Sequence, residues 1–589
     1  MLGIAMKVIV LFYVYVWAAL PFVYASESIE QNEQRVYLEP EGGTISFSKH
    51  WERGSRCTPK EEITIHTKLT LSPEVSMKLE KRLLTVSDPT SEDYGKYFSR
   101  EELTKFLAVS DEQVKTVRRF LGVRDSKLTV SPHKDAIEAT MSCAQAEAIF
   151  RVKLFSYTHV HTNTTTVRAS QRYSVPSTVA PYLSIVSGLS SVPIRRFRLK
   201  LSGSSQSVNS GFQGSPWKSC SANCDGQIVP SVLQSQYRIP TSTIPATAIA
   251  SGMAVAEFAS NWDQEGLNAF ANACALPVNL TVDRMVGTNG AGICQSRHGG
   301  PTCAEAMLDI TYIKALAGNI KLTDVFQSNE FSIQKWALEV AQMSDREIPL
   351  VQSVSFGEDE HELPSVPYMN ECNVEFQKLG LRGVTILFAS GDGGVWGRGG
   401  TTGGVFHPDF PASSPYVTAV GGTVLSTAGT IGNETAWSNS GGGFSNVFPQ
   451  PSYQKGAVSD YIKRASNSLP QQKYWNSTGR AYPDVSALAG GQNAYCVSVD
   501  GKSFNAFTGT SASTPVWAAI IARLNTIRVA KGGKPLGFLN PLIYKNPQAF
   551  FDVTSGINSA GTGEGFAATT GWDPATGMGT PNFNALAKL

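Results

Sequence analysis

The stretch Gly509-Thr510-Ser511-Ala512-Ser513-Thr514-Pro515 says most about the fold of this chain. The apolar residues 516–524 that follow it predict a helix that begins close to the serine. The first N–H groups of a helix have no partner within the helix, and the helix dipole adds positive charge there. Ser511 is then either an ordinary helix cap or a nucleophile placed beside groups that stabilise an oxyanion. Pro515 is expected in the first turn, where its missing N–H costs nothing.

From about Gln227 onward, predicted strands alternate with predicted helices. We expect strands at 254–258, 350–356, 384–389 and 417–420, with helices at 304–317, 332–343 and 368–381. This alternation is typical of an α/β domain, in which helices cover both faces of a mostly parallel sheet. The active site of such a sheet lies at the carboxyl ends of its strands. Both the Gly391-Asp392 turn and Ser511 are expected at such edges.

Residues 34–195 show a different pattern, in which short β-like runs alternate with charged helical stretches. A strand is predicted at 63–69 and an amphipathic helix at 101–107, with Ser99 as its N-cap. We interpret this region as a compact α+β domain without a catalytic constellation. The serine- and glycine-rich residues 201–216 then form a flexible junction before the α/β domain.

The N-terminus has the features of a secretory signal. Lys7 precedes the apolar run 8–22, and Val23-Tyr24-Ala25 supplies a small-residue cleavage site. That run is 15 residues long, which is short for a membrane span of roughly 20 residues. No later apolar stretch is long enough, so we expect a soluble protein of the secretory pathway, the lysosome or the extracellular space. Four sequons agree with this route and are candidate N-glycan sites: Asn163, Asn279, Asn433 and Asn476.

The charge and the cysteine content restrict the partners and the compartment. A net charge of +2 offers no basis for binding nucleic acid. Nine cysteines in an oxidising compartment predict several disulfides and one odd thiol. Cys220 and Cys224 are close enough to close a small loop, and Cys57 and Cys143 can bridge the N-terminal region. Three other cysteines gather ahead of the candidate site: Cys274, Cys294 and Cys303. No Cys-x-x-Cys pair or His/Cys ligand set is visible, so the sequence gives little support for zinc.

A serine nucleophile needs a base, and histidine is the usual one. In the C-terminal domain the histidines are His298, His361 and His407. His298 and His407 lie in loop-like sequence, which we interpret as surface. None of the three has the surroundings typical of a catalytic triad, so the base is better sought among carboxylates.

Two acids on one predicted helix offer such a base. Glu305 and Asp309 are four residues apart, so both side chains share one face of the helix. The helix is apolar around much of its circumference, which favours burial over a solvated face. Two close carboxylates share a proton because both cannot ionise cheaply, and one pKa rises. Such a pair can act as a general base at acidic pH, where histidine is protonated. Asp392 follows a predicted strand and is either a turn residue or a protonated acid that donates to an oxyanion.

Together these residues resemble the sedolisin, or serine-carboxyl peptidase, family. The family motif Gly-Thr-Ser-x-x-x-Pro matches 509–515, its Glu-x-x-x-Asp pair matches Glu305 and Asp309, and its Ser-Gly-Asp turn matches Asp392. The resemblance implies that Ser511 is the nucleophile, that Glu305 acts as general base and then acid, and that Asp309 orients Glu305 and shares its proton. It also implies that Asp392 completes an oxyanion hole with the Ser511 N–H.

The similarity extends along the chain and implies a domain plan. Further segments are similar to family members at 93–98, 353–357, 410–417, 441–449, 479–485 and 536–541. They imply a subtilisin-like fold, preceded by an inhibitory prodomain that is removed autocatalytically at low pH. We therefore expect a signal peptide at 1–25, a propeptide at 26–200, a linker with the processing site at 201–216 and a peptidase domain at 217–589.

The activity implied by the resemblance is that of an acid peptidase, made as a secreted zymogen and delivered to the lysosome. It would release tripeptides from the free N-termini of polypeptides. Two alternatives stay open, an acid endopeptidase of the same family and an inactive secreted binding glycoprotein. Tripeptide release needs an acidic group that binds the substrate amine, and the sequence does not identify that group. A subtilisin-type triad is disfavoured because His298-Gly299-Gly300 does not match a His-Gly-Thr setting.

The resemblance also implies one Ca²⁺ ion in a glycine-rich loop near the C-terminus. Asp552 and Asp573 would supply carboxylates, and Val553, Thr569 and Gly571 would supply backbone carbonyls. Calcium prefers six or more oxygen ligands of these kinds. Thr569 stands where the family typically has glycine, a change that a carbonyl ligand survives. No cysteine occurs in this part of the chain, so calcium is expected to be the main tie that holds the loop.

Overall fold

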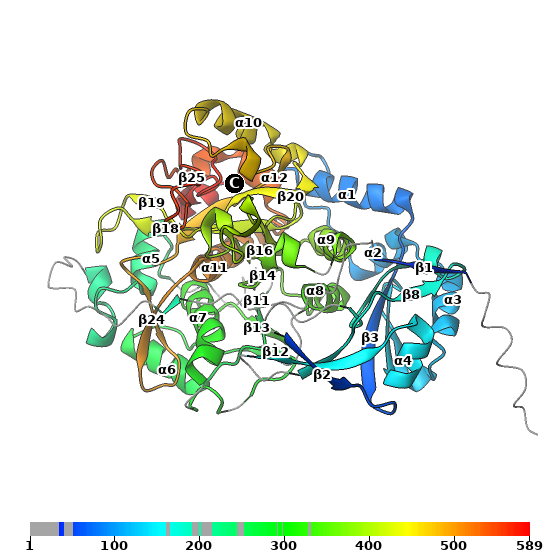
Figure 1. Ribbon diagram of the computed structural model, residues 1–589. Coiled ribbons are helices and arrows are strands. Elements are labelled where there is room, and N and C mark those ends of the chain that lie inside the picture. Colours follow the sequence, from blue (N-terminus) through cyan, green and yellow to red (C-terminus); the bar gives the residue numbers. More distant parts are fainter. Residues whose placement is uncertain are drawn as a thin grey trace, which may run out of the picture.

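The computed structural model describes residues 34–39, 51–160, 165–190, 200–201, 215–242, 244, 252–290, 292–296, 299–327, 332–363 and 365–589. The expected signal segment, Asn163, His298 and most of the linker lie outside these residues. In the described part, no helix is long and apolar enough to cross a membrane. Figure 1 shows an N-terminal α+β domain, in blue and cyan, beside a larger α/β domain.

An antiparallel sheet of strand order β4-β5-β3-β9 forms the centre of the N-terminal domain. The elements of this domain and its junction are β1 (Arg35–Tyr37), β2 (Trp51–Arg56), β3 (Glu62–Leu69), α1 (Pro73–Ser87), α2 (Arg100–Leu107), α3 (Asp111–Leu121), β4 (Leu128–Val130), β5 (Ala136–Ser142), α4 (Cys143–Phe150), β6 (Leu154–His159), β7 (Thr165–Ala169), β8 (Ser174–Pro176), β9 (Leu183–Ser187) and β10 (Lys200–Leu201). The predicted strand is β3 and the predicted helix is α2. Ser99 caps α2 in a reciprocal capping box with Glu102, which satisfies two N–H groups at the helix start.

The α/β domain is built on a central sheet of order β12-β13-β11-β14-β16-β18, in which every pair is parallel. Beyond β18 the sheet continues with β22, which is parallel, and β19, which is antiparallel. The bounds are β11 (Met253–Phe258), β12 (Arg284–Val286), β13 (Leu322–Gln327), β14 (Val351–Val354), β16 (Thr385–Ala389), β18 (Thr418–Leu425), β19 (Glu434–Ala436) and β22 (Val485–Leu488). The predicted parallel α/β sheet is confirmed.

Helices cover both faces of this sheet, as Figure 1 shows for α7 and α11 on one side and α8 and α9 on the other. The helices are α5 (Pro230–Tyr237), α6 (Gln264–Ala273), α7 (Gly299–Ala317), α8 (Ile333–Gln342), α9 (Val366–Leu381), α10 (Lys455–Arg464), α11 (Thr510–Ala530), α12 (Asn540–Lys545) and α13 (Phe583–Leu586). Alternate residues of β11 enter opposite cores, because successive side chains of a strand point to opposite faces. Met253 and Val255 join the core of α7 and α11, whereas Ala256 and Phe258 join that of α8 and α9.

Short strands and disulfides complete the α/β domain. The remaining strands are β15 (Glu358–Asp359), β17 (Asp409–Phe410), β20 (Gly443–Pro449), β21 (Gly479–Tyr482), β23 (Tyr495–Ser498), β24 (Phe504–Thr508), β25 (Phe550–Phe551) and β26 (Thr580–Pro581). The expected Cys57–Cys143 bridge is present. The expected small loop between Cys220 and Cys224 is wrong, because these residues bond to Cys274 and Cys496 respectively.

Tertiary packing explains the second pairing. Ile228 forms a parallel bridge with Tyr495, and this contact carries Cys224 to Cys496 on β23, 272 residues away. Proximity in the sequence is therefore a poor guide to disulfide pairing here. Cys294 bonds to Cys303, and the odd thiol belongs to the buried Cys372.

Candidate active site

Ser511 is the second residue of α11 and is buried. The helix begins at Thr510, next to the serine, as the sequence predicts. Ser511 therefore lies among the first four residues, whose N–H groups have no acceptor within the helix. We expected the strand before Ser511 to belong to the central sheet. This strand, β24, instead belongs to an antiparallel sheet with β10 and β23. Only the Asp392 turn follows a strand of the central sheet directly, namely β16.

Pro515 lies inside α11 and not in its first turn, which corrects the expectation from the sequence. A proline in a helix interior has no N–H to donate to the carbonyl four residues earlier. That carbonyl belongs to Ser511, and it accepts a hydrogen bond from the Ser355 hydroxyl at 3.4 Å. The proline thus diverts the backbone of the candidate nucleophile from the helix to a contact with the loop after β14.

Glu305 and Asp309 lie on α7, which packs directly against α11. The relative exposure is 6% for Glu305 and 0% for Asp309, so the predicted burial of this acidic pair is confirmed. Burial raises the pKa of Asp309 well above its usual range, although hydrogen bonds to Ser355 and Glu257 partly oppose this shift. The Ser355 hydroxyl therefore contacts both Asp309 and the Ser511 backbone. The candidate acid pair and the candidate nucleophile are brought together by the packing of two helices.

Two further acids in this region were not predicted. Glu257 on β11 and Asp324 on β13 are both fully buried. Val255 is the register partner of Asp324, so Glu257 lies two residues further on the same face as Asp324. Burial raises the pKa of Glu257 well above its usual range, and the carboxylates of Asp309, Asp324 and Glu305 raise it further.

The environment of Asp324 is simpler. Burial raises its pKa to about 7, against the opposing effect of a hydrogen bond from Trp262. The Trp262 indole N–H donates to Asp324 Oδ2 at 2.7 Å. A sequence signal existed for Glu257, which interrupts an otherwise apolar buried strand. For Asp324 there was none, because its strand also carries Thr323 and Gln327. The place of both acids in the site becomes clear only once the register shows that both face α7.

Asp392 binds to the start of α11. Its Oδ1 accepts hydrogen bonds from the Thr510 N–H at 2.8 Å and from the Thr510 hydroxyl at 2.9 Å. The Gly391 N–H in turn donates to the Thr510 hydroxyl oxygen at 3.2 Å. A Cβ at Gly441 would lie 1.9 Å from the Ser390 carbonyl oxygen, so glycine is required for this close approach. The turn is thereby held against Thr510, the residue that precedes Ser511.

The candidate histidines His361 and His407 do not belong to α7 or α11. His407 was interpreted as a surface residue but is buried, with a relative exposure of 6%. It lies against the exposed His361, with ring centroids 4.3 Å apart.

Two hydrogen bonds connect residues of the candidate calcium loop. Asp573 Oδ2 accepts a hydrogen bond from the Thr569 N–H at 2.9 Å, and Asp552 Oδ2 accepts one from the Gly571 N–H at 2.8 Å. Both carboxylates thus contact the same short loop. The Thr569 hydroxyl oxygen is buried without a hydrogen-bond partner among the described residues. Oxygen donors of this kind suit a hard cation such as Ca²⁺.

Comparisons with known proteins bear on the family of this chain. Residues 49–192 match the pro-kumamolisin activation domain, and residues 287–531 match the subtilase family. Tripeptidyl-peptidase 1 of Rattus norvegicus is 35% identical over 559 residues, which is 91% of this chain and 93% of the relative. The chain belongs to the tripeptidyl-peptidase 1 family. The human tripeptidyl-peptidase 1 is 34% identical over 560 residues, with the same coverage of both chains.

Membership of the tripeptidyl-peptidase 1 family confirms the resemblance inferred from the sequence. The chain is a serine-carboxyl peptidase that carries its own activation domain, and it is therefore made as a zymogen. Among solved structures, a Pseudomonas sedolisin (serine-carboxyl proteinase) covers 62% of this chain and is itself covered to 97%. Its sequence identity is 23% and its TM-score is 0.49.

Proposed function

We propose that this peptidase releases tripeptides from free N-termini at acidic pH, with Ser511 as nucleophile and Glu305 as base. The observation that carries this proposal is the group of four buried carboxyl groups on β11, β13 and α7, beside the start of α11. A histidine base is protonated in acid, whereas a carboxyl group held among other carboxyl groups still exchanges protons there.

In the proposed reaction, the Ser511 hydroxyl attacks the carbonyl carbon of the scissile peptide bond and passes its proton to Glu305. Asp309 shares that proton through the acid cluster, and Glu257 extends the cluster behind it. The negative charge on the carbonyl oxygen is stabilised by the Ser511 N–H and by Asp392 in its protonated form. Glu305 then returns the proton to the leaving amine, and water releases the acyl group by the reverse sequence.

The prodomain junction supports self-inhibition and nearby processing. Lys200 and Leu201 form β10, which pairs antiparallel with β24, Lys200 opposite Thr508. Thr508 is three residues before Ser511, so the chain passes the candidate nucleophile just before the linker. We place the processing site in this linker, 201–216, and the mature peptidase at 217–589.

The test uses purified proprotein shifted to about pH 4. Wild type and Ser511→Ala are compared on a peptide with a free N-terminus and a reporter after its third residue, and on its N-acetylated copy. We expect wild type to shorten itself and to cleave only the free-amine peptide, while Ser511→Ala does neither. Cleavage of both peptides would identify an acid endopeptidase instead. No cleavage by the mature protein would favour an inactive binding glycoprotein.

For the C-terminal loop we propose one Ca²⁺ ion, held by the carboxylates of Asp552 and Asp573 and the carbonyls of Val553, Thr569 and Gly571. When bound, the ion supplies positive charge to two carboxylates and ties the loop to the strand β25. It takes no part in proton transfer. Removing calcium with a chelator should lower the melting temperature of wild type, but not that of Asp573→Asn. Equal losses in both proteins would contradict the assignment.

We further propose delivery through the secretory pathway, with the lysosome as destination. Asn279 and Asn433 are exposed and accessible to glycosylation. The Asn476 amide instead donates to the Ser445 carbonyl at 3.1 Å, so this sequon competes with a local hydrogen bond. Mass spectrometry of glycopeptides from the secreted protein checks each site.

A further inference from the structure

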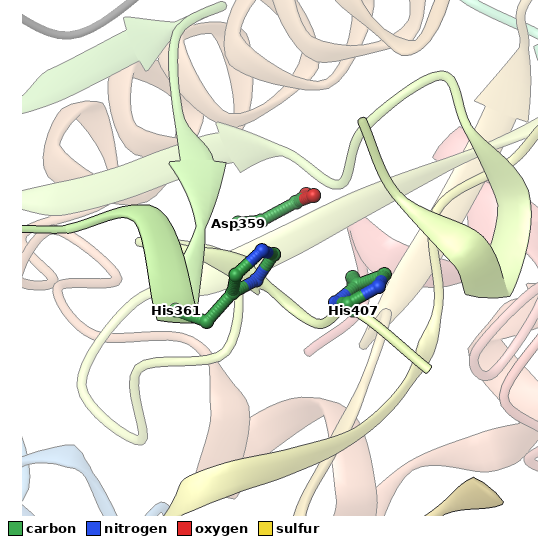
Figure 2. Close-up of side chains that lie close together, drawn as sticks. All are labelled: Asp359, His361 and His407. Atoms are coloured by element: carbon green, nitrogen blue, oxygen red, sulfur yellow. The ribbon is translucent and has the colours of Figure 1, made fainter. Parts of the chain in front are cut away.

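Two histidines and an aspartate lie together outside the candidate active site, as Figure 2 shows. Asp359 ends β15, His361 belongs to the short 3-10 helix Glu360–Glu362, and His407 precedes β17. The antiparallel pairing of β15 with β17 brings these segments together. One carboxylate oxygen and one nitrogen of each imidazole all lie within 4.8 Å of one another.

We propose that Asp359, His361 and His407 bind a Zn²⁺ ion. Imidazole nitrogen and carboxylate oxygen are ordinary zinc ligands, and three protein ligands with a fourth open position form a common type of site. Tetrahedral bonds of about 2.0–2.1 Å place the ligand atoms roughly 3.3 Å apart. The three groups are therefore within a short movement of that geometry. His361 is exposed and supplies this freedom, while Asp359 and His407 are buried.

The two buried ligands are already oriented by neighbouring backbone. His407 Nε2 contacts the Thr402 carbonyl oxygen at 2.8 Å, a contact in which the neutral ring donates through Nε2 and keeps its lone pair on Nδ1. Asp359 Oδ2 accepts hydrogen bonds from the backbone N–H groups of Arg398 at 2.9 Å and Gly399 at 2.8 Å. Contacts of this kind fix the direction of metal ligands and raise metal affinity.

The neighbouring Arg398 keeps Asp359 in place. Among the described residues, three buried carboxyl groups surround its guanidinium. Asp409 contacts it at 2.5 Å, and Glu358 and Asp359 each lie 3.6 Å away. The side chain and the backbone of Arg398 therefore both restrict the position of the Asp359 carboxylate.

The consequence of zinc binding would be to fix the loop that follows the Asp392 turn. This loop begins with the short 3-10 helix Gly394–Trp396 and continues to His407. The His407 N–H donates to the Val395 carbonyl at 3.0 Å, so the two ends of the loop already touch. A metal bond from His407 to Asp359 would join this loop to β15, beside the proposed oxyanion site.

The test is metal binding by full-length Ser511→Ala, saturated with calcium and held at pH 7. Cobalt serves as the spectroscopic probe for zinc, and equilibrium dialysis gives the stoichiometry. We expect one bound Co²⁺ with the intense visible absorption of a tetrahedral site, displaced by Zn²⁺. His361→Asn and His407→Asn, each in the Ser511→Ala background, should bind at least about tenfold more weakly, within the range known for lost metal-site contacts.

The matched control is His66→Asn, a histidine of the N-terminal domain, which should bind cobalt like the parent. Because His361 is exposed, its variant is expected to fold, so it decides the matter even where His407→Asn fails to fold. Equal cobalt affinity and spectra in the parent and in His361→Asn would overturn the proposal, and so would the absence of tetrahedral cobalt in the parent.

Discussion

Two clusters of buried carboxyl groups differ in one respect, the presence of lysines. At the candidate active site, burial raises the pKa values of Glu257 and Asp309 well above the usual range, and neighbouring acids raise that of Glu257 further. Where the prodomain meets α9, Asp135 is equally buried, yet Lys378 and Lys68 outweigh the effect of burial and hold its pKa well below the usual range. Burial alone therefore does not decide the charge of a carboxyl group in this protein.

The contacts at the domain interface explain the difference. Lys68 and Asp135 come from the prodomain, and Glu375 and Lys378 come from α9 of the peptidase domain. Lys378 Nζ lies 2.6 Å from both Asp135 and Glu375, and Lys68 Nζ lies 2.9 Å from Asp135. Pairs of lysines and carboxylates thus hold the two domains together, whereas burial favours the protonated form of Glu257 and Asp309 at the active site.

The two clusters should respond to pH in opposite senses. Asp309 binds its proton more tightly in the folded protein than in the unfolded chain, so its contribution to stability falls as pH rises above about 4. Asp135 binds its proton less tightly in the folded protein. Its contribution is complete above about pH 4 and is lost as pH falls through the depressed pKa. Acid therefore favours the active-site cluster and weakens the interface.

The largest expected effect comes from removing an exchangeable proton at the active site. Asp309→Asn should slow self-processing at pH 4 by about 10²–10⁴-fold, the usual contribution of acid–base groups. It should not lower stability at pH 7, because a neutral amide replaces a carboxyl that burial already disfavours as an anion. Asp460→Asn, on the exposed face of α10, is the control. Normal processing by Asp309→Asn would exclude Asp309 from the proton path.

A large effect on stability is expected at the interface. Lys378→Met leaves two buried carboxylates with Lys68 as their remaining lysine, and breaking such a network costs about 3–5 kcal/mol. Urea unfolding of the Ser511→Ala proprotein at pH 7 measures this loss, which should shrink as pH falls through the depressed pKa of Asp135. Lys105→Met, in an exposed pair with Glu101, should have no measurable effect. A loss that stays constant with pH would contradict the electrostatic explanation.

The smallest effect is expected from replacing His133 of the prodomain. Its Nε2 contacts the Ala341 carbonyl of the peptidase domain at 3.0 Å. Burial lowers its pKa to about 4, with a further contribution from Lys378. The docked form therefore binds fewer protons, and docking weakens as pH falls from about 6.5 to about 4. His133→Asn should move the pH of half-maximal self-processing to a lower value. An unchanged or higher midpoint would remove His133 from the pH response.

The sequence predicts the fold well because its signals are local. Apolar runs and helix caps locate the strands of the central sheet, and the Ser99 cap appears where the residues indicate. The candidate residues Glu305, Asp309, Asp392 and Ser511 also follow from short motifs. Their proximity is a consequence of the packing of α7 and α11, as the alternation of strands and helices implies.

What the sequence misses depends on contacts between distant segments. Glu257 and Asp324 become part of the site only through the register of β11 with β13. The partners of Cys220 and Cys224 depend on how the chain returns to α6 and β23. His361 and His407 meet because β15 pairs with β17, and no spacing between them in the sequence marks a ligand pair.

The most direct test of the central claim is the infrared absorption of protonated carboxyl groups at pH 6. The Ser511→Ala proprotein, which should not process itself, is compared with its Glu257→Gln and Asp309→Asn derivatives. We predict a carbonyl band of buried protonated acids in the parent that weakens in each derivative, and no such weakening when Asp135→Asn is introduced instead. The absence of this band in the parent would contradict the account, because the active-site acids would then be ionised like those of the interface.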